Sequence, residues 1–259
     1  DMATSKLKSG ARIIAIDGIR ITDSLDWSQL LNRKAEKNCL VTFTLPNSNN
    51  PIEEVIKPIS ISTENGLLYK RWIERMNQMT LSLSKGKIAY VHVTGMNDGS
   101  FRDVYDEVLG QHYTKKALIV DTRFNGGGWL HDDLKTFLSG KRYLDFAPQG
   151  NRLNDGEPMG RWTKPSCVLM SEGNYSDAFI FPYVYQQASI GKLIGMPVPG
   201  TGTAVWWETQ IDPTLVFGIP MIATLGKENR PTENLQIEPD LKVELGYSDF
   251  LQGKDTQLE

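Results

Sequence analysis

A serine stands between an apolar stretch and a helical pattern in the second half of the chain. Val168, Leu169 and Met170 are typical of a buried strand, and Ser176 follows after a short turn, just before the apolar run that starts at Ala178. At such a strand–turn–helix junction a serine hydroxyl can reach a substrate, while backbone amides at the helix start face a developing oxyanion. A serine before a helix is also a common capping residue. Ser176 is therefore either a nucleophile or a helix cap.

Three consecutive glycines, Gly126, Gly127 and Gly128, follow a second apolar stretch. Their backbone amides can bind an anion or an oxyanion, because no side chain blocks the approach. The run does not continue into the Gly-Lys-Ser/Thr of a phosphate-binding loop. The alternative interpretation is a tight turn between a strand and a helix.

The composition of the chain disfavours several classes of partner and cofactor. The chain has 259 residues, with 28 Lys and Arg against 31 Asp and Glu and a net charge of −3, so nothing electrostatic favours nucleic acid or an anionic membrane as a partner. Two cysteines, Cys39 and Cys167, cannot form a disulfide framework or a thiolate zinc site. No spacing of His, Asp or Glu resembles a metal site, and no uncharged apolar run reaches the roughly 18 residues of a membrane-spanning helix. We expect no metal and no cofactor.

Two kinds of pattern divide the chain. The first part predicts short strands and turns, and the later part alternates strands with helices, which is typical of an α/β domain with a mixed sheet built from βαβ units. In the first part we predict strands over 11–16, 40–45 and 54–58, a helix over 27–33, a hairpin loop over 46–51 and then a helix over 64–79. In the later part we predict strands over 88–93, 117–121, 166–170 and 192–195 and near Ala204, Phe217 and Met221, helices over 100–109, 130–138 and 177–189, and a long loop over 147–164.

Taken together, the glycine run over 126–128 and the serine turn over 171–176 resemble the tail-specific (S41) family of serine peptidases. The shared motifs are Asp-x-Arg-x-Asn-Gly-Gly-Gly over 121–128 and Glu-x-x-x-Ser-Asp-Ala over 172–178. Further matching segments are GKIAYVHV at 86–93, GKLIG at 191–195 and TENLQIEPDL at 232–241, so that the resemblance covers residues 7–246. It implies an α/β core of the ClpP/crotonase type.

One position separates two branches of this family. The C-terminal processing branch pairs its serine with a lysine 25 residues later. Here 201 − 176 = 25 leads to Thr201, which has no basic nitrogen to accept a proton. The chain therefore resembles the tricorn-like branch more closely.

The tricorn-like branch implies a role for several residues. By position, Ser176 is the nucleophile and Glu233 helps to orient a histidine that accepts its proton. The oxyanion donors are the amides of Asp177 and Gly127, or of Gly126 if the register slips by one.

The histidine of this branch precedes a PDZ domain. The chain has three histidines: His92 in a strand-like run, His112 in a connecting turn and His131 beside two aspartates at a helix start. We expect none of them to be the base. The chain is then the C-terminal part of a longer enzyme, and we expect its 259 residues alone to be inactive or weakly active.

The start of the chain resembles part of a PDZ domain. Residues 10–19, GARIIAIDGI, are similar to the GD-x-I-x-x-I-N-G segment of those domains, although the first PDZ strands have no counterpart before Lys6. A generic β-hairpin subdomain is the alternative. We predict a partial PDZ-like domain over 1–60, a helical linker over 61–80 and a peptidase catalytic core over 81–259.

These features predict a serine endopeptidase core that cleaves peptides or unfolded proteins by acyl-enzyme chemistry. Asp145 is either a pocket residue that favours basic P1 side chains or a solvated charge, and Trp206 and Trp207 line a peptide groove or belong to the core. The alternative function is a non-catalytic peptide-binding module of the same fold. A homo-oligomer, a cytoplasmic location and an exported location are all compatible with the sequence.

Overall fold

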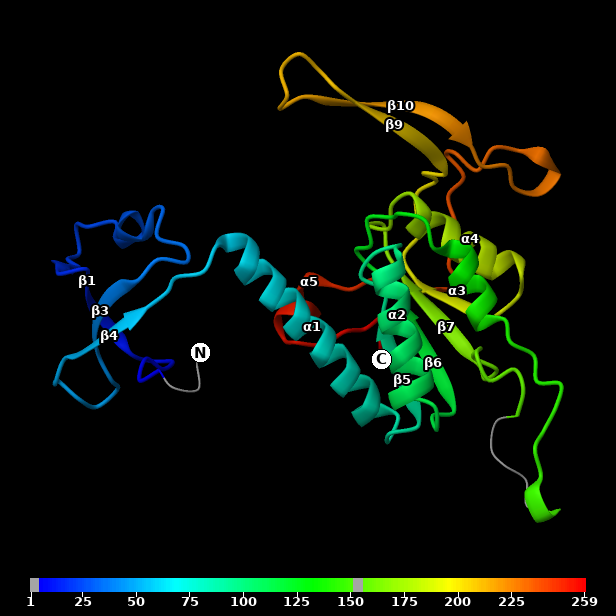
Figure 1. Ribbon diagram of the computed structural model, residues 1–259, viewed down its shortest axis with the longest axis horizontal. Coiled ribbons are helices and arrows are strands. Elements are labelled where there is room, and N and C mark those ends of the chain that lie inside the picture. Colours follow the sequence, from blue (N-terminus) through cyan, green and yellow to red (C-terminus); the bar gives the residue numbers. More distant parts are fainter. Residues whose placement is uncertain (1–4, 151–155) are drawn as a thin grey trace. The chain divides into compact units, whose positions relative to one another are not determined.

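The computed structural model describes residues 5–150 and 156–259 (Figure 1). The chain divides into two compact units, Asp1–Trp72 and Ile73–Glu259. This division lies inside the predicted linker, and the predicted domain boundaries at 60 and 80 stay a prediction.

The N-terminal unit contains an antiparallel sheet with the strand order β2-β1-β3-β4. Alternate side chains of β3 are buried, as expected for a strand with one face on a core. That core holds Ile16, Cys39, Val41 and Phe43. The elements are β1 (Arg12–Ile16), β2 (Ile19–Arg20), the 3-10 helix η1 (Trp27–Leu31), β3 (Cys39–Thr44) and β4 (Ile52–Ile56). The predicted strands are confirmed, with β4 two residues earlier than expected, and the PDZ resemblance stays a prediction.

A long helix, α1 (Ile61–Leu83), crosses the division between the two units. At its start, Thr63 donates its backbone N–H to the Ser60 hydroxyl at 3.0 Å. At its end, Gly86 adopts a φ of 73° and donates its N–H to the carbonyl of Leu81 at 2.7 Å, which is a common way to end a helix. The helix predicted over 64–79 is confirmed and is longer at both ends because of these two caps.

The C-terminal unit is built on a five-stranded sheet with the order β11-β8-β7-β6-β5. Each pairing among these strands is parallel. The strands are β5 (Ile88–His92), β6 (Ala117–Asp121), β7 (Ser166–Met170), β8 (Lys192–Gly195) and β11 (Leu241–Lys242). The predicted α/β class is confirmed, with the parallel and antiparallel strands of the chain in separate sheets.

Helices alternate with the strands of this sheet. They are α2 (Asp98–Asp106), which continues into one π-helical turn, η2 (Glu107–Gln111), then α3 (His131–Leu138), α4 (Asp177–Gln187) and α5 (Tyr247–Leu251). Val91, Val120 and Val168 of the central strands are almost inaccessible, as expected for a parallel sheet whose two faces are covered. Since β6 and β7 are neighbours, their carboxyl ends bring the glycine run and the serine turn to one edge of the sheet.

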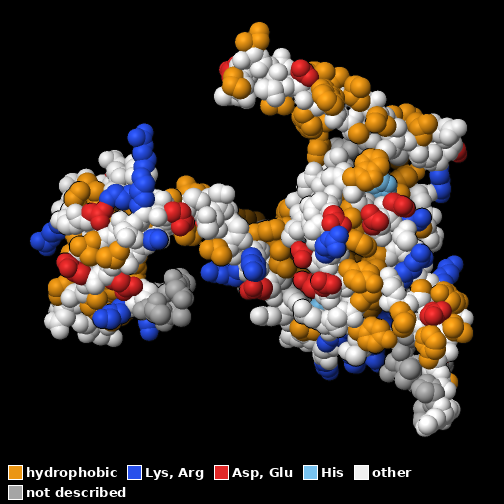
Figure 2. All heavy atoms as spheres, viewed as in Figure 1, with side chains coloured by type: hydrophobic (Ala, Val, Ile, Leu, Met, Phe, Trp, Pro, Cys, Tyr) orange, Lys and Arg blue, Asp and Glu red, His pale blue; other side chains and the backbone are white. Residues whose placement is uncertain are grey.

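Two strands form an antiparallel hairpin of their own, β9 (Thr203–Thr209) and β10 (Val216–Ala223). Trp206 and Trp207 on β9 are 61% and 60% exposed, and Figure 2 shows hydrophobic side chains gathered along this hairpin. The interpretation of the tryptophan pair as core is therefore wrong. A groove lined by them stays a prediction.

The predicted long loop over 147–164 is described only in part, since residues 151–155 lie outside the described residues. Its described flanks hold the 3-10 turn η3 (Pro148–Gly150) and a single bridge between Leu144 and Glu157. A further 3-10 turn, η4 (Lys227–Asn229), follows the hairpin. Within 5–150 and 156–259, no helix has both the length and the apolar character needed to cross a bilayer.

Candidate active site

Ser176 lies at the sharp turn between β7 and α4. Its backbone has φ 55° and ψ −122°, a conformation that L-residues other than glycine rarely adopt and that costs of order 1–3 kcal/mol. Its side chain makes no capping hydrogen bond to α4. Ser176 thus occupies the N-cap position of α4 without the side-chain hydrogen bond of a capping serine. The turn has the geometry by which a strand–turn–helix junction exposes a serine hydroxyl.

Buried polar side chains hold this turn in place. Asn174 is buried, and its Nδ2 donates to the hydroxyl of Thr122 at 2.9 Å and to the carbonyl of Ala178 at 3.0 Å. The backbone N–H of Ser176 donates to the Thr201 hydroxyl at 2.8 Å. Thr201, at the position where the other branch of the family has a lysine, thus supports the serine from its backbone side.

The glycine loop, residues 126–128, lies directly against the serine turn. A Cβ built on Gly127 would lie 2.7 Å from the Cβ of Ser176 and 2.7 Å from the carbonyl oxygen of Tyr175. Gly127 also has a φ of 94°. Only glycine fits here without displacing the serine, so the two predicted motifs form one site.

The amide of Gly127 already has a partner in this structure. It donates to Oδ1 of Asn125 at 2.9 Å, and Asn125, which is fully buried, donates its Nδ2 to the carbonyl of Val93 at 2.7 Å. The next peptide bond is oriented by Met96, whose N–H donates to the Gly127 carbonyl at 3.1 Å. Because a trans peptide directs its N–H opposite to its C=O, the amide of Gly128 points away from Met96.

The side chain of Asp177 connects the serine turn to the start of α3, just after the glycine loop. It is 1% exposed. Its Oδ2 accepts the backbone N–H groups of Leu130 at 2.5 Å and His131 at 3.0 Å, and its Oδ1 lies 2.5 Å from Nδ1 of His131. Asp177 therefore caps α3 from a different segment, while its own N–H lies at the start of α4 next to Ser176.

None of the three imidazoles hydrogen-bonds to Ser176 in the described part of the chain. His92 and His112 are buried, and burial lowers the pKa of both. His131 is half-buried, and its hydrogen bond to Asp177 raises its pKa. The expectation that the base is not among these residues stays a prediction, since no contact identifies the proton acceptor.

Glu233 lies at the base of the β9–β10 hairpin. Its carboxylate accepts the backbone N–H of Thr203 at 2.9 Å. The next residue, Asn234, donates its N–H to the Gly200 carbonyl at 3.0 Å. The segment 200–203 therefore contacts Glu233 through Thr203 and the serine turn through Thr201, which brings the predicted glutamate into the same neighbourhood as Ser176.

Asp145, the predicted specificity residue, forms an ion pair with Arg142 and is partly exposed. Its charge is therefore partly compensated by a residue three positions earlier. A role in binding basic side chains stays a prediction. Among the described residues, no cluster of three or more His, Cys, Asp or Glu side chains has the arrangement of a metal site.

A buried ionic network supports the first residues of the glycine motif. Arg123 is fully buried and donates to Asp121, to Asp255 near the C-terminus and to Gln257. The hydroxyl of Tyr90 donates to Asp121 at 2.9 Å. The Asp and Arg of the motif thus fix the end of β6 rather than face a substrate.

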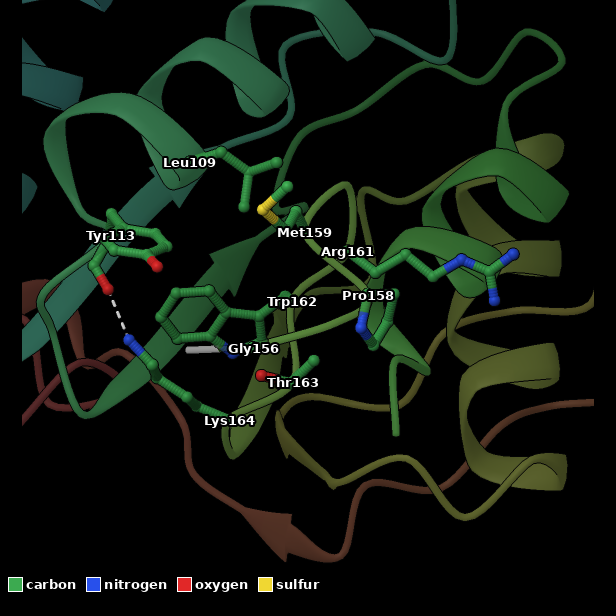
Figure 3. Close-up of a pocket in the computed structure, with 9 residues that line it drawn as sticks. All are labelled: Leu109, Tyr113, Gly156, Pro158, Met159, Arg161, Trp162, Thr163 and Lys164. Atoms are coloured by element: carbon green, nitrogen blue, oxygen red, sulfur yellow. Dashed lines mark hydrogen bonds between the residues drawn. The ribbon is translucent and has the colours of Figure 1, made fainter. Parts of the chain in front are cut away.

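A small pocket elsewhere in this unit does not include any predicted site residue (Figure 3). The ammonium of Lys164 lies 5.2 Å from the ring centre of Tyr113 and 5.1 Å from that of Trp162, so this side chain is held by cation–π contacts. The pocket lining is Leu109, Tyr113, Gly156, Pro158, Met159, Arg161, Trp162, Thr163 and Lys164.

Sequence reasoning did not assign roles to Asn125, Asn174 or the side chain of Asp177. Each is a polar residue in the turn that follows a buried strand, which is the signal that could have identified them. Each also binds at least one residue far away in the sequence, as Asn174 binds Thr122, and that pairing could not be read from local patterns.

Comparisons with known proteins identify the family of this chain. A sequence profile described as peptidase family S41 matches residues 87–243. The chain is 25% identical over 258 residues to a tricorn protease homolog of Saccharolobus solfataricus, covering 98% of this chain and 23% of that protein. It is 27% identical over 192 residues to the tricorn protease of Thermoplasma acidophilum, covering 74% of this chain and 18% of that protein.

A solved structure of the tricorn protease has the same fold. Its TM-score to this chain is 0.79 at 24% identity, covering 96% of this chain and 24% of the other. The chain thus spans about a quarter of the length of this relative. These matches confirm the predicted resemblance to the S41 family and to its tricorn-like branch, and they do not test the PDZ part.

Proposed function

This chain belongs to peptidase family S41, and we propose that it supplies the catalytic core of a longer serine endopeptidase that cleaves peptides or unfolded proteins. One observation carries the proposal. Ser176 is held in a strained backbone conformation, makes no side-chain capping bond, and lies against Gly127, where an added side chain would overlap the serine. Strain of this kind persists at functional sites because the surrounding structure enforces it.

The proposed chemistry is acyl transfer. The Oγ of Ser176 attacks the scissile carbonyl carbon as its proton passes to a histidine, and the C–N bond then breaks as that proton moves to the leaving amine. Water hydrolyses the resulting ester and restores the serine. We assign the base to a histidine outside these 259 residues, with Glu233 orienting it from the base of the hairpin.

The oxyanion would bind between the serine turn and the glycine loop. Asp177 offers its backbone N–H at the start of α4, where the helix dipole favours negative charge. The amide of Gly127 would have to exchange its bond to Asn125 for the oxyanion. The amide of Gly128 points away from Met96 and is the alternative donor, as is that of Gly126 if the register differs by one.

The contacts of the serine turn and the glycine loop do not determine which peptides bind. Asp145 would favour a basic P1 side chain only if the substrate displaced Arg142 from its carboxylate. An extended peptide paired to a strand edge is the common mode of binding for such segments.

One observation favours the alternative of a non-catalytic peptide-binding module. The Gly127 amide is occupied by Asn125, and no imidazole among the described residues hydrogen-bonds to Ser176. A peptide carbonyl could still bind to the remaining glycine amides without being cleaved. The strained serine favours catalysis over this alternative, because binding alone would not require it.

The test uses the full-length protein with Ser176→Ala and, as a matched control, Ser82→Ala on the exposed side of α1. We expect Ser176→Ala to lower kcat by a factor on the order of 10⁴–10⁶ and to abolish labelling by a fluorophosphonate probe. The control should retain both. Peptide hydrolysis that persists in Ser176→Ala would show that the nucleophile is assigned wrongly. Peptide binding without labelling of the wild type would favour the binding module.

A further inference from the structure

The serine turn and the glycine loop are connected at two points, one on each side of Ser176. Before the serine, the N–H of Tyr175 donates to the carbonyl of Asn125 at 3.0 Å. After the serine, the carboxylate of Asp177 accepts the N–H groups of Leu130 and His131. The residues that flank Ser176 thus bind the residues that flank the three glycines.

The second connection depends on one side chain more than on the others. Asp177 is almost completely buried, and a buried carboxylate is stable only when hydrogen bonds replace its lost water. Two of its bonds come from the backbone. The third comes from Nδ1 of His131, with the imidazole 2.5 Å from Oδ1.

We propose that His131 is a positioning residue that acts through Asp177 to hold the glycine loop against the Ser176 turn. The inference rests on the proposed function for its effect on catalysis, while the connection itself belongs to the fold. In this proposal His131 is not the general base that accepts the proton of Ser176. It sets the distance between the oxyanion donors and the nucleophile, a geometry to which rates of acyl transfer are sensitive.

The connection is strongest when the imidazole is protonated, since charge-assisted hydrogen bonds are stronger than neutral ones. Asp177 raises the pKa of His131, the neighbouring Asp132 and Asp133 on α3 act in the same direction, and burial opposes them. The adjacent Trp129 ring, 5.4 Å away between centroids, carries no charge. The imidazolium therefore persists above the ordinary histidine pKa of about 6.5.

The sign of the pH effect follows from this direction. The pKa of His131 is higher in the folded protein than in the unfolded chain. The extra stabilisation from the charged imidazole is therefore fully present below the unfolded-state pKa, and it is lost as pH rises through the folded-state pKa. A general-base histidine has the opposite effect, since it must be neutral to accept a proton. Thus His131 should affect the alkaline limb of the pH profile, while the base sets the acid limb.

The first experiment needs no activity. With only three histidines in the chain, proton NMR of the 259 residues should resolve one imidazole that titrates above 6.5, that is absent in His131→Gln and that shifts to lower pH in Asp177→Asn. Hydrogen exchange of the glycine-loop amides should become roughly tenfold faster in His131→Ala. The control Asp106→Asn, an exposed position at the end of α2, should leave exchange within about twofold of the wild type.

The second experiment measures the pH profile of kcat in the full-length protein. His131→Ala should lower kcat roughly ten- to a hundredfold with little change in KM. His131→Gln keeps a neutral donor and should recover most of the rate, without the alkaline limb. A His131 resonance that titrates at or below 6.5, unchanged loop exchange in His131→Ala, or a wild-type alkaline limb in His131→Gln would each overturn the proposal. If the NMR and exchange results hold while Ser176→Ala remains active, only the proposed function fails.

Discussion

Two regions of the C-terminal unit carry the proposed site, and they are built in opposite ways. The serine turn and the glycine loop are held by Asn125, Asn174 and Asp177, all almost inaccessible to solvent. The β9–β10 hairpin, with Glu233 at its base, instead exposes apolar side chains such as Trp206 and Phe217. Figure 2 shows hydrophobic side chains along this hairpin.

The difference concerns how accurately each region can place a catalytic group. A buried, fully paired polar network has few alternative arrangements, so the nucleophile and its neighbouring amides are fixed before substrate binds. A two-stranded hairpin without a covering layer is marginally stable in water. The position of Glu233 therefore depends on the contacts at the hairpin base, such as its bond to the Thr203 amide.

The largest expected effect comes from closing the space between the glycine loop and the serine. In the full-length protein, Gly127→Ala should lower the rate of fluorophosphonate labelling at least roughly a hundredfold, because its Cβ would overlap that of Ser176. It should also lower the unfolding free energy by about 2–4 kcal/mol through backbone strain and overpacking. Gly126→Ala is the matched control, since no atom lies within 4 Å of its added Cβ. Equal effects of the two variants would contradict the close contact.

Removing one buried amide should have a smaller effect. Asn174→Ala leaves the Ala178 carbonyl and the Thr122 hydroxyl without their donor, which should cost about 2–3 kcal/mol of unfolding free energy. Urea denaturation of the 259-residue chain measures this loss. The exposed Asn50→Ala serves as the control. A loss below about 0.5 kcal/mol would mean that the network does not hold the serine turn.

The buried His112 should make the unfolding free energy of the chain depend on pH. Both ring nitrogens of His112 lack a hydrogen-bond partner among the described residues, and burial lowers its pKa. His112 stays neutral in the folded protein at a pH where it is protonated in the unfolded chain. It therefore destabilises the folded protein as pH falls below about 6.5. His112→Leu should raise the unfolding free energy by about 1 kcal/mol at neutral pH and by more at pH 5. A gain that shrinks on acidification would contradict the sign.

The smallest effect is expected on the hairpin. Trp206→Ser and Trp207→Ser should change the unfolding free energy of the isolated chain by less than about 0.5 kcal/mol, since both rings are exposed. Thermal unfolding at low protein concentration measures this. A loss that grows with protein concentration would show that these rings are buried in an assembly, and the contrast with the serine turn would then be smaller than proposed.

Much of this site was predictable because its signals are local. The apolar runs of β6 and β7 predict buried strands, and the turns that follow them hold Gly127 and Ser176; that the two strands are neighbours is shown by the structure. The tryptophan pair was ambiguous, since an aromatic pair is typical of either a core or a groove. Its exposure follows from the absence of a covering layer over the hairpin in the described part of the chain, which no local pattern reports.

The sequence by itself determined the two motifs, the buried strands that they follow and the family to which the chain belongs. Each of these is read from residues that are close together in the sequence. Only the tertiary structure decided that Ser176 is strained and makes no side-chain capping bond, that Asn125 occupies the Gly127 amide and that His131 reaches Asp177. Asn125 is itself oriented by Val93, the Ser176 amide binds Thr201, and His131 binds Asp177, and in each of these pairs the two residues are far apart in the sequence. These contacts form only when the parallel strands bring those partners together.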